Sequence, residues 1–151
     1  MALTVRTCQF EDLPYVGVMF SDLYNDQDKS IENEGGLLVD RLSEFFMVAE
    51  FDGRIVGFIV GARGPVDAIG LEMAREAFPD VSGYLEVQDL YVAPDHRNKG
   101  IGSLLMTNIL KRGREAGLTH SMVYSSNVDY QRIGRFYEKF GYRIDHLFMK
   151  R

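Results

Sequence analysis

The sequence LYVAPDHRNKGIGSLL, residues 90–105, joins an apolar, strand-like run to an amphipathic run that begins at Ile101. Its two glycines allow the backbone to close around an anion, and N–H groups at a helix start point toward such an anion along the helix dipole. From Arg97 to Arg114 the chain has five Lys or Arg residues and no acidic residue. The pattern predicts a strand, a phosphate-binding loop at residues 97–103, which we call the cradle, and a helix.

The order of the glycines separates this loop from two commoner phosphate loops. A P-loop needs a Gly-Lys-Ser/Thr triplet, and the sequence contains none. A dinucleotide fingerprint needs a third glycine three positions after Gly102, where this sequence has Leu105. What remains is R-x-x-G-x-G, starting at Arg97, which resembles the coenzyme A loop Q/R-x-x-G-x-G/A of the GNAT superfamily of N-acetyltransferases.

A second motif follows in the order that this resemblance requires. Residues 135–142 read RFYEKFGY and resemble the family's helix F-Y-E-K-x-G-F/Y, with Asn127 and Tyr130 shortly before them. One helix and one strand fit between the two motifs. The resemblance covers nearly all of the chain, and it implies a GNAT-like α+β fold that uses acetyl-CoA as cosubstrate.

The pattern of hydrophobic residues and turns leads to the same fold class. Asp52-Gly53 between two β-rich runs is a strong hairpin signal, and strands alternate with helices in the second half of the chain. Strands are expected at residues 4–7, 45–51, 54–61, 84–92, 119–125 and 142–148, and helices from residue 11 onward, at 68–78, at 98–116 and at 130–140. This order predicts a mixed, mostly antiparallel twisted sheet flanked by helices.

Length and composition bound the organisation of the protein. A chain of 151 residues with 46% hydrophobic content is expected to form a single domain over residues 1–151. The longest apolar run, residues 55–62, is far shorter than the about 20 residues that cross a bilayer, and residues 1–6 lack the apolar core of a signal peptide. We therefore expect a cytoplasmic protein with no membrane partner.

Charge and metal-ligand chemistry exclude two further classes of function. A net charge of −5 argues against general nucleic-acid binding, which needs a broad basic surface. Cys8 is the only cysteine, so no disulfide can form within the chain, and it is expected to be a small apolar residue rather than a nucleophile. His96, His120 and His146 share no ligand-type spacing, so no metal site is predicted.

The predicted strand at 84–92 carries polar residues that a doubly covered strand would normally avoid. Glu86 lies eleven residues before Arg97, a spacing that resembles the general-base glutamate of some GNAT members. A free ammonium with a pKa of ~10.4 needs such help at neutral pH. Alternatively, Glu86 only hydrogen-bonds a buried neighbour. Asp89, which strand alternation places on the opposite face unless a bulge intervenes, is the second candidate base.

The resemblance also implies how the coenzyme is bound. In the family this strand and its neighbour splay apart, which leaves backbone groups of Leu90, Tyr91 and Val92 for the pantetheine arm and one N–H for the thioester carbonyl. The pyrophosphate is expected to contact the seven residues of the cradle: Arg97, Asn98, Lys99, Gly100, Ile101, Gly102 and Ser103.

Tyr137 is the candidate proton donor to the departing thiolate, a role that the tyrosine of F-Y-E-K has in similar proteins. A phenol with a pKa of ~10 is reasonably matched to a thiol of ~8.5. Alternatively, Tyr137 is a core residue of an aromatic helix stripe. Asn127 and Tyr130 are expected to contact the pantetheine or phosphate region, although Asn127 equally fits the cap of the following helix.

The leading functional hypothesis is direct transfer of an acetyl group from acetyl-CoA to a primary amine in a ternary complex. The acceptor would be a small molecule or, less simply, a protein N-terminus or lysine. The alternative from another class is a non-catalytic acyl-CoA-binding regulatory module. Retention of Glu86 and Tyr137 favours the enzyme.

Two segments remain outside the motifs. Residues 22–40 contain six acidic residues and the single base Lys29, which suggests either a site that attracts a cationic acceptor or a solvated acidic loop. Residues 64–82 are an insertion relative to the compact family pattern, and their expected role is limited to a lid or an oligomer contact, such as that of a homodimer.

Overall fold

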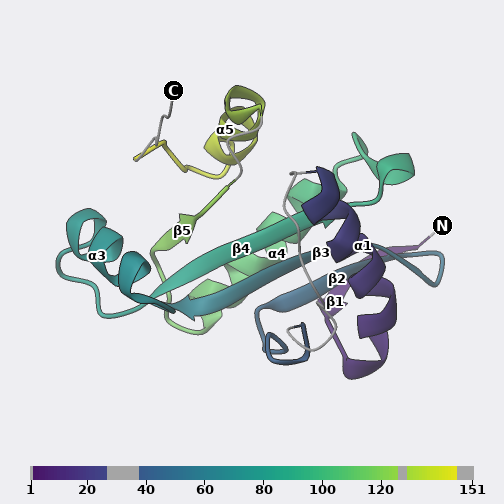
Figure 1. The fold of residues 1–151 in the computed structure, drawn as a ribbon, viewed down its shortest axis with the longest axis horizontal. Helices are drawn as coiled ribbons and strands as arrows, with labels where there is room; N and C mark the ends of the chain where they lie inside the picture. The colour runs from purple at the N-terminus through teal and green to yellow at the C-terminus, as the bar shows by residue number, and fades with distance from the viewer. Residues whose placement is uncertain (1, 27–37, 126–128, 146–151) are drawn as a thin grey trace.

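The fold is built on one sheet (Figure 1). The computed structural model of the chain describes residues 2–26, 38–125 and 129–145. Within these residues the strands β1 (Leu3–Thr7), β2 (Phe46–Phe51), β3 (Arg54–Gly64), β4 (Tyr84–Val92) and β5 (Ser121–Val123) are hydrogen-bonded in the order β1-β2-β3-β4-β5. The first three pairings are antiparallel and β4 pairs with β5 in parallel. The predicted mixed, mostly antiparallel α+β sheet is confirmed.

Helices cover both faces of this sheet, and a further helix lies beyond one end (Figure 1). Among the described residues they are α1 (Leu13–Asp26), α3 (Ala68–Ala77), α4 (Ile101–Glu115) and α5 (Tyr130–Glu138), with 3-10 turns η1 (Phe10–Asp12) and η2 (Pro94–His96). Figure 1 shows α1 and α4 on opposite faces, α3 beyond one end of the sheet and α5 after β5. No helix in this part of the chain is long and apolar enough to cross a membrane.

Strand alternation explains the two cores. One set of β2 and β3 side chains, including Phe46 and Phe58, packs against α1, and the alternate set, including Met47 and Ile59, packs against α4. The predicted hairpin turn is confirmed at Asp52-Gly53, where both residues have positive φ, the conformation that a two-residue I′ turn requires.

A β-bulge at Gln88 changes which side chains of β4 share a face. Val60 of β3 pairs with Asp89, but the next residue, Gly61, pairs with Val87, so Gln88 has no partner of its own on β3. Val87 and Leu90 both pack on the α4 side. Asp89 therefore lies on the same face as Glu86, and simple alternation, which places them on opposite faces, is wrong at this point.

Near the C-terminal end the expected strand at 142–148 is not formed over residues 142–145, and residues 146–148 lie outside the described part of the chain. Tyr142 is held by side-chain contacts instead. Its hydroxyl is hydrogen-bonded to the Ser121 hydroxyl at 2.5 Å, and its ring lies edge-on to Tyr137 at 5.7 Å between centroids. These contacts attach the end of α5 to β5 without a strand ladder.

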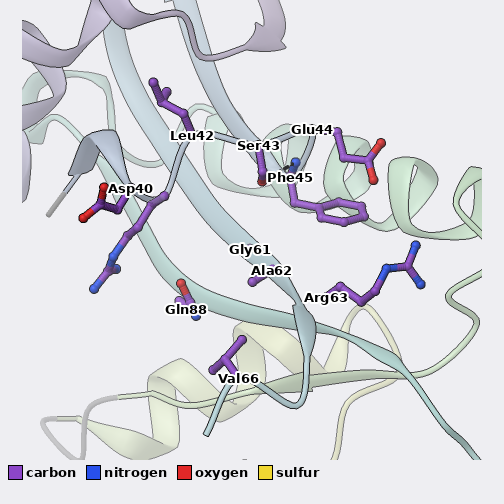
Figure 2. A pocket seen from close by; sticks show the side chains of 11 residues that line it. Asp40, Leu42, Ser43, Glu44, Phe45, Gly61, Ala62, Arg63, Val66 and Gln88 are labelled. Carbon is purple, nitrogen blue, oxygen red and sulfur yellow. Dashed lines mark hydrogen bonds between the residues drawn. The ribbon is translucent and has the colours of Figure 1, made fainter.

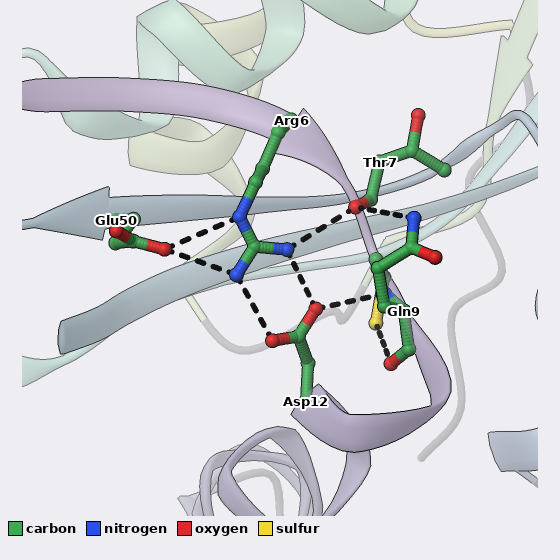
Figure 3. A network of polar contacts seen from close by, with 6 residues as sticks. Arg6, Thr7, Gln9, Asp12 and Glu50 are labelled. Atoms are coloured by element: carbon green, nitrogen blue, oxygen red, sulfur yellow. Dashed lines mark hydrogen bonds and ion pairs between the residues drawn. The ribbon is translucent and has the colours of Figure 1, made fainter. Parts of the chain in front are cut away.

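An arginine network fastens β1 to β2 and to the start of α1 (Figure 3). Arg6 donates to both oxygens of Asp12, at 2.7 and 3.0 Å, and to Glu50 at 3.0 Å. The Gln9 N–H also donates to Asp12, at 2.8 Å. The hydrogen bonds from Arg6 hold the pKa of Asp12 below its usual value. Next to this network Cys8 is buried, and burial raises the pKa of its thiol to about 12.

Candidate active site

Strands β4 and β5 diverge at the centre of the candidate site. Their pairing ends at Val87 and Val123, whereas β4 continues to Val92. The Ala93 N–H donates to the Val56 C=O at 2.8 Å, so alternation directs the backbone groups of Leu90 and Val92 away from β3 and toward the open side. Arg97 Nε, which donates to the Val92 C=O at 2.8 Å, lies on that side. We call this opening the splay.

The three strand residues predicted for the pantetheine arm therefore differ. The backbone groups of Leu90 and Val92 face the splay, where an extended amide chain could pair with them. The backbone of Tyr91 faces β3, and its ring stacks on Phe58 at 6.1 Å between centroids. The N–H and C=O groups of Leu90 and Val92, rather than those of Tyr91, face the open side.

The cradle has the backbone conformation of an anion site. Asn98 and Gly100 both have positive φ, 59° and 80°, and Gly100 is the N-cap of α4. Because Gly100 has no side chain, it gives no capping hydrogen bond, and the first-turn N–H groups of Ile101, Gly102 and Ser103 are left for an external acceptor. These groups sit at the positive end of a 15-residue helix.

The five basic residues of this region do not all act at the cradle. Lys111, Arg112 and Arg114 lie in the last turns of α4, about 15 Å from its start at a rise of about 1.5 Å per residue. Arg112 donates to Thr7 Oγ1 and to the Glu44 C=O. Helix α4 therefore places three of the five basic residues that the sequence brings close together far from the cradle. Arg97 and Lys99, both exposed, are the basic side chains of the cradle.

Helix α5 packs against the start of α4 through Phe136. A Cβ at Gly102 would lie 3.6 Å from the Phe136 ring, so the two motifs predicted from the sequence meet. Tyr137 follows, with its ring edge-on to Phe136 at 5.1 Å. Burial, then Tyr142 and Asp89, raises the pKa of Tyr137, so the phenol stays protonated at neutral pH. Tyr130 begins α5 and is partly exposed, and Asn127 lies outside the described residues.

Glu86 is buried, with 4% of its surface exposed. The backbone of Val66 lies close enough to its carboxylate to oppose a rise of its pKa, and Oε2 has no hydrogen-bond partner among the described residues. Burial, and secondly the charge of Asp67, raises the pKa of Glu86. A buried carboxylate oxygen without a donor is costly, so the arrangement favours a group that arrives from outside.

Asp89 is the weaker of the two candidate bases in this structure. Its Oδ2 accepts from Arg41 Nη1 at 2.8 Å, and Arg41 in turn lies over the Phe20 ring of α1. A carboxylate that holds a guanidinium is stabilised in its charged form and is a poor proton acceptor. Asp89 nevertheless lies near enough to Tyr137, the candidate acid, for its charge to raise the pKa of that tyrosine.

A cavity of about 410 Å³ opens beside the bulge (Figure 2). Gln88, the bulge residue, and Val66 belong to its wall, and the backbone of Val66 is also near the Glu86 carboxylate. The cavity is lined by Asp40, Arg41, Leu42, Ser43, Glu44, Phe45, Gly61, Ala62, Arg63, Val66 and Gln88. Its volume suits a small molecule.

The acidic segment 22–40 is described only at its ends. Asp22 is exposed on α1, and Asp40 lines the cavity. Asp28, Glu32 and Glu34 lie outside the described residues. The prediction that this segment selects a cationic acceptor therefore stays a prediction, supported here by Asp40.

The sequence patterns did not single out Tyr84, Tyr124 and Asp67, which the fold brings to Glu86. Tyr84 shares a face of β4 with Glu86, a relation that alternation could have indicated. Asp67 is the N-cap of α3, and a cap signal says nothing about what lies beneath the helix. The sequence gives no signal that Tyr124 lies near Glu86, because its position depends on the parallel pairing of β4 with β5.

Comparison with known proteins agrees with this geometry. The family model described as Acetyltransferase (GNAT) family matches residues 9–142. The chain is 30% identical over 129 residues, 82% of its length, to the streptothricin acetyltransferase of Streptomyces lavendulae, and it spans 58% of the length of that relative.

Solved structures show the same fold at low identity. AAC(6')-Iy in complex with the bisubstrate analogue CoA-S-monomethyl-acetylneamine superposes with a TM-score of 0.75, 14% identity and coverage of 100% of this chain and 98% of that chain. A GCN5-related N-acetyltransferase from Ralstonia eutropha JMP134 gives a TM-score of 0.74, 18% identity and coverage of 99% and 98%.

Proposed function

Because the chain belongs to the acetyltransferase (GNAT) family, we propose that it transfers an acetyl group from acetyl-CoA to a primary amine by direct attack in a ternary complex. The observation that supports the proposal most directly is the position of the splay. On one side of it is the start of α4, which has no side-chain cap and suits a pyrophosphate. On the other side is the buried Glu86 carboxylate, whose Oε2 has no hydrogen-bond partner among the described residues and suits an amine.

The residues present fit the coenzyme. The N–H groups of Ile101, Gly102 and Ser103, with Arg97 and Lys99 beside them, would hold the pyrophosphate. Backbone groups of Leu90 and Val92 would pair with the pantetheine arm, and Asn127 and Tyr130 would complete the contact. The bound coenzyme supplies an acetyl group activated as a thioester.

Glu86 is the proposed general base. Its raised pKa brings it closer to neutrality than an ordinary carboxyl, which improves proton abstraction from the incoming ammonium. The proton moves from the amine nitrogen to a carboxylate oxygen, directly or through one water. Asp89, held by Arg41, is not the base in this proposal.

Tyr137 is the proposed proton donor to the departing thiolate. Its raised pKa keeps the hydroxyl protonated over the whole range in which a protein of this kind works. A donor of such low acidity acts by hydrogen-bonding the sulfur as charge develops there, and an N–H directed into the splay would do the same for the carbonyl oxygen.

The acceptor class that we propose is a polycationic amine of the aminoglycoside or streptothricin kind. The 30% identity to a streptothricin acetyltransferase supports it. The cavity wall contains Asp40 and Glu44 as well as Arg41 and Arg63, and its two carboxylates could hold such an acceptor by charge-assisted hydrogen bonds.

An amine panel with thiol release as the readout tests the function. We expect acetyl-CoA-dependent thiol release with streptothricin or an aminoglycoside, and less with n-butylamine. Coenzyme binding without turnover on any amine would refute the enzyme and leave the acyl-CoA-binding module.

A further inference from the structure

A polar cluster lies under the first turn of α3, in the insertion at residues 64–82. Asp67 is the N-cap of this helix, and its Oδ1 accepts from the Gly70 N–H at 2.6 Å. Tyr84, 1% exposed, donates from its hydroxyl to the Gly70 C=O at 3.4 Å. The Tyr84 and Tyr124 hydroxyls both approach Gly70, at 3.1 and 3.4 Å from where its Cβ would be.

The oxygens of this cluster converge on one point. A Cβ at Gly70 would lie 3.1 Å from Asp67 Oδ1, 3.1 Å from the Tyr84 hydroxyl and 3.4 Å from the Tyr124 hydroxyl. The absence of a side chain at position 70 is therefore what allows the three groups to approach one another.

Glu86 also faces this cluster, and its carboxylate adds negative charge to it. Its charge raises the pKa of both Tyr84 and Tyr124, after burial, and the charge of Asp67 raises its own. Among the described residues, the charged group that affects the pKa of Glu86 is thus the Asp67 carboxylate, not a cation. Together with the unpartnered Oε2, this arrangement calls for a positively charged hydrogen-bond donor.

The cluster adjoins the splay. Tyr124 directly follows Val123, the last residue of β5, and Val123 pairs with Val87. The next residue of β4 is Gln88, which lines the cavity. Tyr124, 36% exposed, therefore lies where β5 leaves β4. A primary ammonium has three N–H donors. The cluster offers the same number of acceptors: Oε2 of Glu86, the Asp67 carboxylate and the Tyr124 hydroxyl.

We propose that Glu86, Asp67 and Tyr124 form the subsite that binds the reacting primary ammonium of the acceptor, and that the insertion at residues 64–82 selects the amine through Asp67. The inference rests on the proposed acetyl transfer and names the residues, beyond the base, that hold its acceptor. It gives α3 a function that is not a lid.

Asp67→Asn isolates the charge, because asparagine caps a helix as well as aspartate does and α3 keeps its start. We expect the KM for neamine to rise roughly 10- to 100-fold, the loss of a charge-assisted hydrogen bond, with little change in coenzyme A affinity. Asp80→Asn, in an exposed turn of the same insertion, removes the same charge elsewhere and should leave KM unchanged.

The pH profile separates a binding role from a structural one. Asp67, Tyr84 and Tyr124 are the titratable groups that face Glu86. Because the Asp67 charge raises the pKa of Glu86, Asp67→Asn should move the acidic limb of kcat/KM to lower pH, and Asp80→Asn should not move it. Tyr124→Phe, which removes one acceptor, should raise KM without this shift.

Calorimetric titration of neamine into the complex of the protein with coenzyme A distinguishes the failure of the subsite from the failure of the proposed transferase. Binding by the parent protein that weakens in Asp67→Asn, without acetyl transfer, would sustain the subsite and refute the transferase. Absence of neamine binding by the parent, or equal KM, binding and pH profiles for Asp67→Asn and the parent, would overturn the subsite.

Discussion

Substitution of Gly102 by glutamate should abolish coenzyme binding while the protein stays folded. Position 102 is in the first turn of α4, where a carboxylate stabilises a helix by about 0.3–1 kcal/mol through the dipole. Replacing glycine inside a helix contributes a further gain of roughly 0.5–1 kcal/mol. A Cβ there meets Phe136 at 3.6 Å, which is ordinary van der Waals contact. Neither strain nor helix loss therefore offsets these gains.

The same carboxylate occupies the place of the pyrophosphate. Its negative charge, close to two phosphates that share the N–H groups of Ile101 and Ser103, should lower affinity by at least about 3 kcal/mol, more than a hundredfold. Gly100→Ala should act in the opposite sense on stability. At φ 80° a side chain costs about 1–2 kcal/mol, although no atom lies within 4 Å of the new Cβ.

Thermal unfolding and calorimetric titration with coenzyme A measure the two effects separately. Thr107→Glu, an exposed position further along α4, introduces the same charge away from the first turn and should leave affinity nearly unchanged. Gly102→Gln adds similar bulk without charge and should give an intermediate loss. If Gly102→Glu binds coenzyme A as tightly as the parent, the cradle is not the pyrophosphate site.

Three further predictions concern the candidate acid, the candidate base and the arginine network. Tyr137→Phe should lower kcat by roughly 10- to 1,000-fold with coenzyme affinity almost unchanged, and an unchanged kcat would return Tyr137 to the core. Glu86→Gln should depress turnover mainly at low pH, where the unassisted amine is scarcest, with partial rescue at high pH; identical pH–rate profiles would eliminate Glu86 as the base. Asp12→Asn should lower the free energy of unfolding by roughly 1–3 kcal/mol at neutral pH, since it weakens the hydrogen bonds from Arg6. Because the pKa of Asp12 is lowered in the folded state, that contribution is present above the ordinary carboxyl pKa and is lost as pH falls through the folded value, so denaturant melts of mutant and parent should converge in acid.

The sequence predicts the sheet and most of the helices because the signals involved are local. Asp52-Gly53 requires only its own two residues to specify the turn. The cradle is likewise a contiguous segment, and its positive φ values at Asn98 and Gly100 arise within it. The strand expected at 142–148 is not formed over residues 142–145, where the Tyr142 side chain contacts Tyr137 and Ser121 instead, a contact between segments that the local sequence does not specify.

Features that depend on pairing between distant segments escaped prediction. The bulge at Gln88 is defined by the pairing with β3, in which Val60 pairs with Asp89 and Gly61 with Val87. The sequence of β4 alone gives no signal for it. The distance of Lys111, Arg112 and Arg114 from the cradle follows from the length of α4, which separates in space residues that are close in sequence. The cluster at Glu86 combines residues from β4, from the end of β5 and from the insertion.

The bulge links these observations. With regular alternation, Asp89 would face α4 and its charge would enter an apolar core. The extra residue turns Asp89 to the face of Glu86, where it forms an ion pair with Arg41, whereas Glu86 has no cationic partner among the described residues. The pairing of β4 with β5 ends at Val87, the residue before the bulge. One inserted residue thus gives two neighbouring carboxylates different partners at the point where the strands part, and this is where the proposed transfer would bring an amine and a thioester together.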